Sequence, residues 1–212
     1  MAIPASKRAR VAALVAAAIL LLLVVSQILL PGIGEGAIED RLTENGGVAD
    51  VSLSATPAAR LLWGSGDRIA IDGTGLELDL DTEDDPVVFD DLDRFGEVEI
   101  VISDSEAGPF AIDSFRLTRS GEGAYELDSE SSTSAADLAR FGVDSANLPG
   151  SGFVGALLNL TGVGGQSLPI DLDMTLESDD GRIRVVDGGG EIAGIPTGPL
   201  AELITTAIVV RL

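Results

Sequence analysis

The feature that most limits the fold of this chain is a two-residue alternation of apolar and polar side chains. It is clearest in residues 168–176, where every second position is apolar: Leu168, Ile170, Leu172, Met174 and Leu176. Successive side chains of a β-strand point to opposite faces, so this stretch predicts a strand with one apolar and one acidic face. Similar alternation occurs in residues 51–54, 67–80, 97–104, 110–117, 124–130 and 182–187. The pattern predicts a mostly antiparallel sheet that buries one face.

Two of these stretches change phase part-way along. The apolar positions are odd up to Ile71 and even from Leu76, so the phase changes across residues 73–75. A similar slip separates Ile112 from Phe115. Such a slip indicates either a β-bulge or the meeting of two strands. Because bulges bend strands, we expect the sheet to be strongly curved.

Short helices are expected between and beside the strands. They are predicted within residues 31–47 after an exit turn, from Pro57 to Gly64, within 132–142 and within 198–207. The predicted fold is therefore α+β, with a strongly curved, mostly antiparallel sheet wrapped around a few short helices.

An apolar segment, VAALVAAAILLLLVVSQILL (11–30), precedes the predicted domain. Twenty helical residues span roughly 30 Å, about the thickness of a bilayer core. The preceding residues 1–10 are basic, which predicts that they stay in the cytoplasm and that the rest faces outward. We favour a single-pass anchor in the cell membrane over a cleaved signal peptide, and both interpretations export residues 35–212.

The charge of the predicted domain excludes several functions. Residues 35–212 hold all 35 acidic residues and ten of the 13 basic ones, a net charge of −25. Such a domain should not bind nucleic acid, whose phosphates need Lys and Arg. The chain contains no His and no Cys, and its single lysine is Lys7. We therefore expect no enzyme and no cofactor, because the commonest general base and the commonest metal ligand are missing. A hydrolase that uses a pair of carboxylates is the remaining enzymatic alternative, but acids on the alternate face of strands are what solvation predicts.

The acidic segment 79–96 partly copies a calcium-binding loop. Asp79, Asp81 and Glu83 have the spacing of the first three ligands, but Asp84 stands where glycine is needed. Asp90, rather than Glu, occupies the last ligand position. A solvated acidic loop is the favoured interpretation, and no metal site is assigned.

Three large apolar residues, Leu61, Leu62 and Trp63, lie between two predicted strands, where a hairpin needs only a polar turn. They either pack in the core or form a lipid-contacting element, such as the mouth of a groove or a tip that touches the bilayer. Tryptophan suits that boundary because its ring is apolar and its N–H can stay hydrated.

Three motifs occur in an order that resembles a known family. The strand VSLSATP (51–57) leads into the short apolar helix, and Gly64, Asp67 and Arg68 then enter the next strand. Late in the chain, GIPTGPLAELI (194–204) has the form of a turn into a final helix. This order resembles the LmeA-like phospholipid-binding family of bacterial cell-envelope proteins.

The resemblance implies a fold similar to the tubular lipid-binding (TULIP) domains, with a curved sheet around a long helix and an apolar groove. It also implies phospholipid binding in the envelope. The aromatic residue that is usual in the family's short helix is absent at Ala58, and Trp63 comes later.

We therefore expect a domain that holds or transfers a phospholipid or polyprenyl-type lipid. The alternative is a non-catalytic structural or protein-interaction module of the envelope with a filled core and an envelope protein as its partner. The residues predicted to contact lipid are Leu61, Leu62, Trp63, Ile69, Ile71, Ile112, Phe115, Leu172, Met174 and Leu203.

Overall fold

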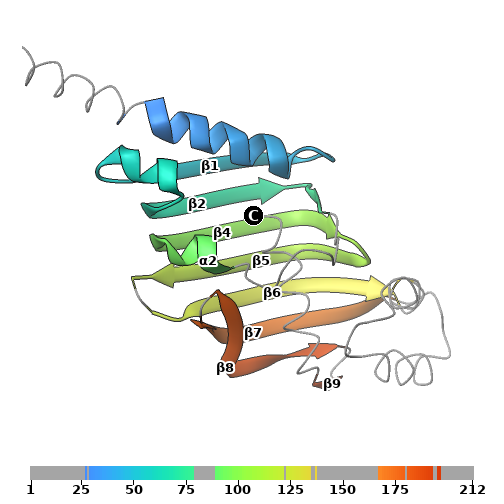
Figure 1. The fold of residues 1–212 in the computed structure, drawn as a ribbon. Helices are drawn as coiled ribbons and strands as arrows, with labels where there is room; N and C mark the ends of the chain where they lie inside the picture. Colours follow the sequence, from blue (N-terminus) through green and yellow to red (C-terminus); the bar gives the residue numbers. More distant parts are fainter. Residues whose placement is uncertain are drawn as a thin grey trace, which may run out of the picture.

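The fold is an open, curved β-sheet with a few short helices, seen in a computed structural model (Figure 1). The structure describes residues 27, 29–78, 89–121, 123–134, 137, 167–179, 181–192 and 195–196. The strands are β1 (Val48–Ser54), β2 (Gly66–Thr74), β3 (Glu77–Leu78), β4 (Phe95–Ala107), β5 (Phe110–Ser120), β6 (Tyr125–Ser134), β7 (Ser167–Asp179), β8 (Arg182–Ile192) and β9 (Ile195–Pro196). The described helices include one over residues 29–42, the 3-10 helix η1 (Ala58–Trp63) and α2 (Phe89–Asp93).

The strands form a single sheet in the order β1-β2-β4-β5-β6-β7-β8-β9, with β3 also paired to β4. All pairings are antiparallel except those of β2 and β3 with β4. The predicted sheet-rich, mostly antiparallel fold is therefore confirmed. The parallel pairing was not predicted. It needs a crossover between β2 and β4, and α2 lies on that crossover.

The alternation of the sequence becomes the two faces of the sheet. In β7 the apolar residues from Leu168 to Leu176 are buried, whereas Asp171 and Asp173 between them are exposed. We call the buried side the inner face and the acidic side the outer face. The buried apolar side chains of the inner face are Val51, Leu53, Ile69, Ile71, Val98, Ile100, Ile102, Phe110, Ile112, Phe115, Leu117, Tyr125, Leu127, Leu168, Ile170, Leu172, Met174 and Leu176.

The two predicted phase slips belong to one row of irregular positions across three strands. Gly75, with φ of 66°, separates β2 from β3, and Asp104 in β4 has a positive φ of 47°. The register that pairs Ser103 with Ser114 places Asp104 opposite Asp113. The first slip is thus a junction of two strands, whereas the second is a β-bulge in β5.

The bulge in β5 ends this row. It lies between Ile112 and Ser114 in the pairing of β5 with β6. Because the bulge absorbs the extra residue, β6 keeps an unbroken alternation from Tyr125 to Thr133. The row therefore bends β2–β3, β4 and β5 together without disturbing the strands beyond them.

The helix over residues 29–42 covers the free edge of β1 (Figure 1). Glu39 Oε1 accepts a hydrogen bond from the Val51 N–H at 3.0 Å, and Glu35 Oε1 accepts one from the Leu53 N–H at 2.8 Å. The spacings match, because i and i+4 on a helix and i and i+2 on a strand are both separated by about 6–7 Å. Unpaired N–H groups at a sheet edge invite association with other chains, so the two carboxylates protect this edge.

Close packing of this helix on β1 depends on Gly34. A Cβ atom at that position would lie 2.8 Å from Leu53 Cδ1. Leu42 is buried in the core, and Ile38 packs against it. An exit turn was predicted near Pro31, which is wrong, because Pro31 lies within the continuous helix 29–42. The docking of this helix on β1 extends helical structure back to the apolar segment.

Several predicted elements lie outside the described residues, among them the predicted helix 198–207 with Leu203, acidic residues 79–88 and most of the apolar segment 11–30. Of the predicted helix 132–142 only Asp137 is described as helical. Its N–H donates to Ser134 Oγ at 3.0 Å, as the capping box predicted. Within the described part of the chain, no helix is both long and apolar enough to span a membrane.

Replacing Glu39 tests the protection of the β1 edge. We expect Glu39→Ala to lower the free energy of unfolding by about 1 kcal/mol and to speed hydrogen exchange at the Val51 amide. Glu39→Gln should have a smaller effect, because its amide oxygen still accepts the bond. Hydrogen exchange and urea unfolding of the full chain in detergent micelles measure both. Glu44→Ala, at an exposed position after the helix, is the control for loss of charge. An equal effect of the Glu39→Ala and Glu44→Ala variants would contradict the role of Glu39 in protecting the β1 edge.

Candidate functional site

Six of the predicted lipid-contacting residues lie together on the inner face. Ile69 and Ile71 come from β2, Ile112 and Phe115 from β5, and Leu172 and Met174 from β7; their side chains are 1–4% exposed. The sheet thus brings together residues as far apart in sequence as Ile69 and Met174. In this structure all six pack within the hydrophobic core. Leu203 lies outside the described residues.

The inner face also carries a polar strip that sequence reasoning missed. Ser129, Ser131 and Thr133 of β6 point inward and are buried. Ser129 Oγ donates to the Ser114 carbonyl oxygen and Thr133 Oγ1 to the Pro109 carbonyl oxygen. Ser131 Oγ has no partner within the described residues. The alternation of inward and outward positions continues through SESST (129–133). It was missed because the inward residues there are serine and threonine, which are not apolar.

The three apolar residues of η1 divide between core and surface. Pro57 precedes the helix, and Gly64 ends it with a left-handed φ of 64° and an N–H that donates to the Leu61 carbonyl oxygen at 3.0 Å. Leu61 packs against the core, whereas Leu62 and Trp63 are 65% and 70% exposed. Core packing therefore describes Leu61 but not its two neighbours.

A cleft of about 630 Å³ opens at the end of the sheet that also carries η1 and α2. Its lining comes from seven elements and the turns between them. The lining residues are Arg60, Gly66, Asp67, Asp93, Arg94, Phe95, Gly96, Arg119, Gly121, Gly123, Ala124, Tyr125, Glu177 and Ser178. The cleft was not predicted from the sequence.

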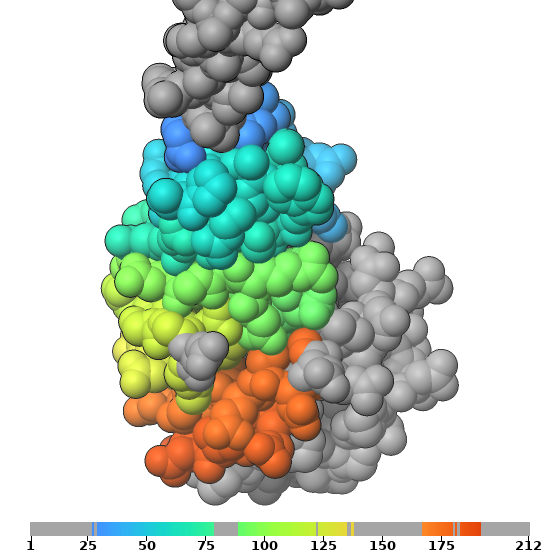
Figure 2. Space-filling view, turned by 60° about the vertical axis from the view of Figure 1, so that its left-hand side comes forward, coloured from blue at the N-terminus to red at the C-terminus, as the bar shows by residue number. Residues whose placement is uncertain are grey.

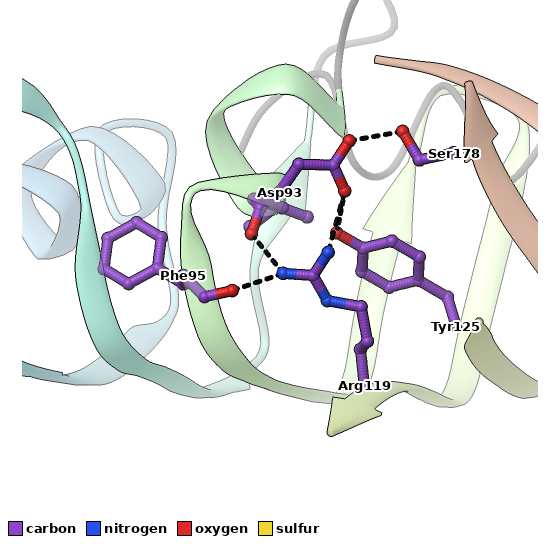
Figure 3. Close-up of polar contacts among 6 residues, drawn as sticks. Asp93, Phe95, Arg119, Tyr125 and Ser178 are labelled. Atoms are coloured by element: carbon purple, nitrogen blue, oxygen red, sulfur yellow. Dashed lines mark hydrogen bonds and ion pairs between the residues drawn. The ribbon is translucent and has the colours of Figure 1, made fainter. Parts of the chain in front are cut away.

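Asp93, the last residue of α2, organises the polar wall of this cleft (Figure 3). Its Oδ1 accepts hydrogen bonds from Arg119 Nη1 at 2.9 Å and from the Tyr125 hydroxyl at 2.8 Å. Its Oδ2 accepts a hydrogen bond from Ser178 Oγ. One carboxylate thus joins α2 to β5, β6 and β7.

Arg119 is a buried cation at an inward position of β5. Its Nη2 donates to the Leu92 carbonyl oxygen at 2.9 Å and to the Phe95 carbonyl oxygen (Figure 3). The guanidinium carbon lies 4.7 Å from the centre of the Tyr125 ring, within range of a cation–π interaction. Its Nε has no partner within the described residues. A buried guanidinium with this many acceptors holds the start of β4 against β5.

Tyr125 remains neutral in this site. Burial raises the pKa of its hydroxyl well above the ordinary value, and the hydrogen bond to Asp93 raises it further. Phe89 packs edge-on against the ring, with 4.7 Å between ring centres. The hydroxyl therefore acts as a donor to Asp93 rather than as a base. Ser178 also donates to Asp93, and the chain has no histidine to activate a serine.

The outer part of the cleft carries two more arginines, both paired with aspartates. Arg60 of η1 lies 2.5 Å from Asp67, and Arg94 pairs with Asp90. Both pairs are roughly half exposed, so each contributes little to stability and exchanges readily with other ions. Among the lining residues three arginines balance three carboxylates. The lining of the cleft is therefore balanced in charge, in a domain with a net charge of −25.

Within the described residues, no group of three or more carboxylates is placed to hold a metal ion. Asp90 and Asp91, from the end of the acidic segment, pair with Arg94 instead. The rest of the suggested calcium loop, residues 79–88, lies outside the described part of the chain.

A comparison of this chain with protein-family models, curated proteins and solved structures finds no match. The geometry of the inner face, of η1 and of the cleft must therefore carry the functional argument.

Breaking the Asp93–Arg119 pair should destabilise the fold strongly. We expect Asp93→Ala to lower the free energy of unfolding by about 3 kcal/mol, because it leaves the Arg119 charge buried without its partner. Asp93→Ala with Arg119→Met should recover part of this loss. The exposed pair of Arg184 and Glu177 supplies the control, since Arg184→Ala should cost less than about 1 kcal/mol. Equal losses for the two single variants, measured by urea unfolding, would contradict the structural role.

The single tyrosine allows its buried state to be tested by titration. Above pH of about 10 the unfolded chain loses the tyrosine proton while the folded chain keeps it, so the stability of the fold should fall as the pH rises. Phenolate absorbance should appear only together with unfolding. The Tyr125→Phe variant should be less stable at neutral pH, but its stability should depend less on pH in this alkaline range. Phenolate formation near pH 10 in a chain that remains folded would show that the hydroxyl is accessible.

Proposed function

We propose that this protein is a membrane-anchored, outward-facing module that binds a phospholipid or polyprenyl-type lipid in the cell envelope. It would hold or pass the lipid without making or breaking bonds. The observation that carries the proposal is the inner face, a largely apolar surface that runs across β1 to β7 of one open, curved sheet and is interrupted by the polar strip of β6. The resemblance to the LmeA-like family and to TULIP-like wrapping of a sheet around helices supports the same function.

The energetic requirement for a lipid carrier favours such a surface. Each methylene of an acyl chain costs about 0.8 kcal/mol to expose to water, so a 16-carbon chain needs an apolar lining worth roughly 12 kcal/mol. Branched aliphatic side chains such as Ile71, Ile112 and Leu172 supply that lining without imposing one shape on the chain. The sheet is not closed: its first edge, at β1, is covered by the helix over residues 29–42, and its other end is formed by β8 and the two-residue strand β9.

Lipid entry has a structural cost in this protein. The apolar side chains of the inner face are 0–8% exposed, so they contact protein atoms in the structure. An acyl chain can reach Phe115 or Met174 only if the groups that pack on them move aside. The proposal therefore predicts uptake that is limited by opening of the core, and not by diffusion to a preformed tunnel.

The same burial favours a second candidate function, a non-catalytic structural or interaction module with a filled core. Its partner would meet the outer face, where Glu130, Asp171 and Glu191 lie side by side on β6, β7 and β8. Like charges placed opposite one another destabilise a sheet, and a basic envelope protein would relieve that repulsion. This module would bind polylysine in a salt-sensitive manner and would leave lipid unbound.

Photo-crosslinking on the inner face separates the two functions. The full chain is placed in vesicles that contain a phospholipid with a photoactivatable group on its acyl chain, and the adducts are mapped by mass spectrometry. Lipid binding predicts adducts on the β5 and β7 peptides that contain Ile112, Phe115, Leu172 and Met174. Excess unlabelled phospholipid should reduce these adducts.

Adducts confined to the apolar segment 11–30 and to η1 would contradict lipid binding in the core. Salt-sensitive binding of polylysine, lowered in the charge variant Asp171→Asn and unaffected by lipid, would then support the interaction module. The matched control Glu177→Gln removes one charge from the same strand, but Glu177 is already paired with Arg184. It should therefore change polylysine binding less.

A further inference from the structure

Two large apolar side chains of η1 are exposed beside each other although Leu61, their neighbour, is packed. Leu62 is 65% exposed and Trp63 is 70% exposed. Large aromatic side chains are usually well buried, so an exposed Trp next to an exposed Leu points to a contact surface. Because Leu61 and the Gly64 turn hold the helix in place, the two side chains are fixed toward solvent.

The position of η1 relates this pair to the predicted anchor. Gln27 belongs to the apolar segment 11–30, and its side-chain amide reaches the start of η1. Oriented to satisfy both groups, it donates to the Ala55 carbonyl oxygen at 3.3 Å and accepts from the Ala58 N–H at 2.8 Å. Figure 2 shows the teal part of the chain, which includes η1, beside the blue start of the helix. The outer end of the apolar segment and η1 therefore lie side by side.

Two other large apolar side chains are exposed near the start of the helix that follows the apolar segment. Leu29 and Ile33, on the first turns of the helix over residues 29–42, are also exposed. We call the exposed pair Leu62 and Trp63 of η1 the apolar tip. Because Gln27, near the outer end of the predicted membrane span, contacts the start of η1, the tip lies close to the place where that span would leave the bilayer.

The charge distribution favours lipid over protein as the occupant of the tip. Residues 55–66 contain no acidic residue and one arginine, in a domain with a net charge of −25. A basic protein would instead be drawn to the acidic outer face. The tip is where the domain can approach lipid phosphates with the least repulsion.

We propose that the apolar tip is a membrane-contact site, at which Leu62 and Trp63 insert into the interfacial layer of the bilayer that holds residues 11–30. Tryptophan is enriched at that layer because its ring is apolar while its N–H can remain hydrated. The contact fixes how the domain stands on the membrane. It also brings Arg60, which belongs both to η1 and to the lining of the cleft, toward the level of the lipid phosphates.

The inference rests on the proposed membrane anchoring, but it does not require lipid to enter the core. Inner-face adducts in the crosslinking experiment report on the core, whereas Trp63 reports on the tip. Either result can therefore fail without the other.

Because the chain has one tryptophan, its fluorescence reports on Trp63 alone. The full chain is reconstituted into zwitterionic vesicles with either ordinary or brominated acyl chains. We expect a blue-shifted emission, loss of most of the intensity in brominated vesicles, and protection from iodide in the aqueous phase. Emission that is unchanged by bromination and fully quenched by iodide would overturn the proposal.

A second variant controls for the mere nearness of an anchored domain to the membrane. Trp63→Phe with Val48→Trp moves the single tryptophan to an exposed position at the other end of β1, about 20 Å along the strand. This variant should respond to iodide and not to brominated lipid. Equal quenching by brominated lipid in both chains would overturn the proposal. A Trp63 emission that changes with protein dilution but not with bromination would also overturn it, because it would indicate contact with a second copy of the chain.

Discussion

The burial of one aliphatic face of a single sheet is the constraint on which the rest of this structure depends. A lone sheet has two faces and two edges, and hydrophobic burial stabilises it only if one face is removed from water. Here the side chains from Val51 to Leu176 on that face are almost fully buried. The row of irregular positions through Gly75, Asp104 and the β5 bulge crosses three neighbouring strands of this open, curved sheet, and bulges bend the strands that carry them.

The two borders of this core are completed by polar groups. At the β1 edge, Glu35 and Glu39 accept the N–H groups of Leu53 and Val51, so the helix docks with hydrogen bonds to two of the edge donors. At the strand ends near α2, Arg119 donates to Asp93 and to two backbone carbonyl oxygens. Burying this ion pair costs desolvation free energy. In exchange, the pair fixes the position of α2, a helix of only five residues.

The surface is divided by charge in a way that bears on function. The outer face carries aligned carboxylates, the cleft balances its charges, and the apolar tip carries almost none. Under the proposed membrane contact, this division would let the tip approach lipid while the acidic outer face is repelled by anionic surfaces. The proposed lipid binding and the proposed membrane contact both use this division, one through the inner face and the other through Leu62 and Trp63.

The sequence by itself determined the strands, their buried sides and the two phase slips, because alternation is a local property that each strand carries in its own residues. It could not assign Leu61 to the core and Trp63 to the surface, since neighbouring residues of a short helix look alike until packing separates them. The parallel pairing of β2 with β4 and the meeting of Asp93, Arg119, Tyr125 and Ser178 were likewise decided by the tertiary structure. Those contacts join residues up to 85 positions apart, and only the register of the whole sheet brings such distant groups within hydrogen-bonding distance.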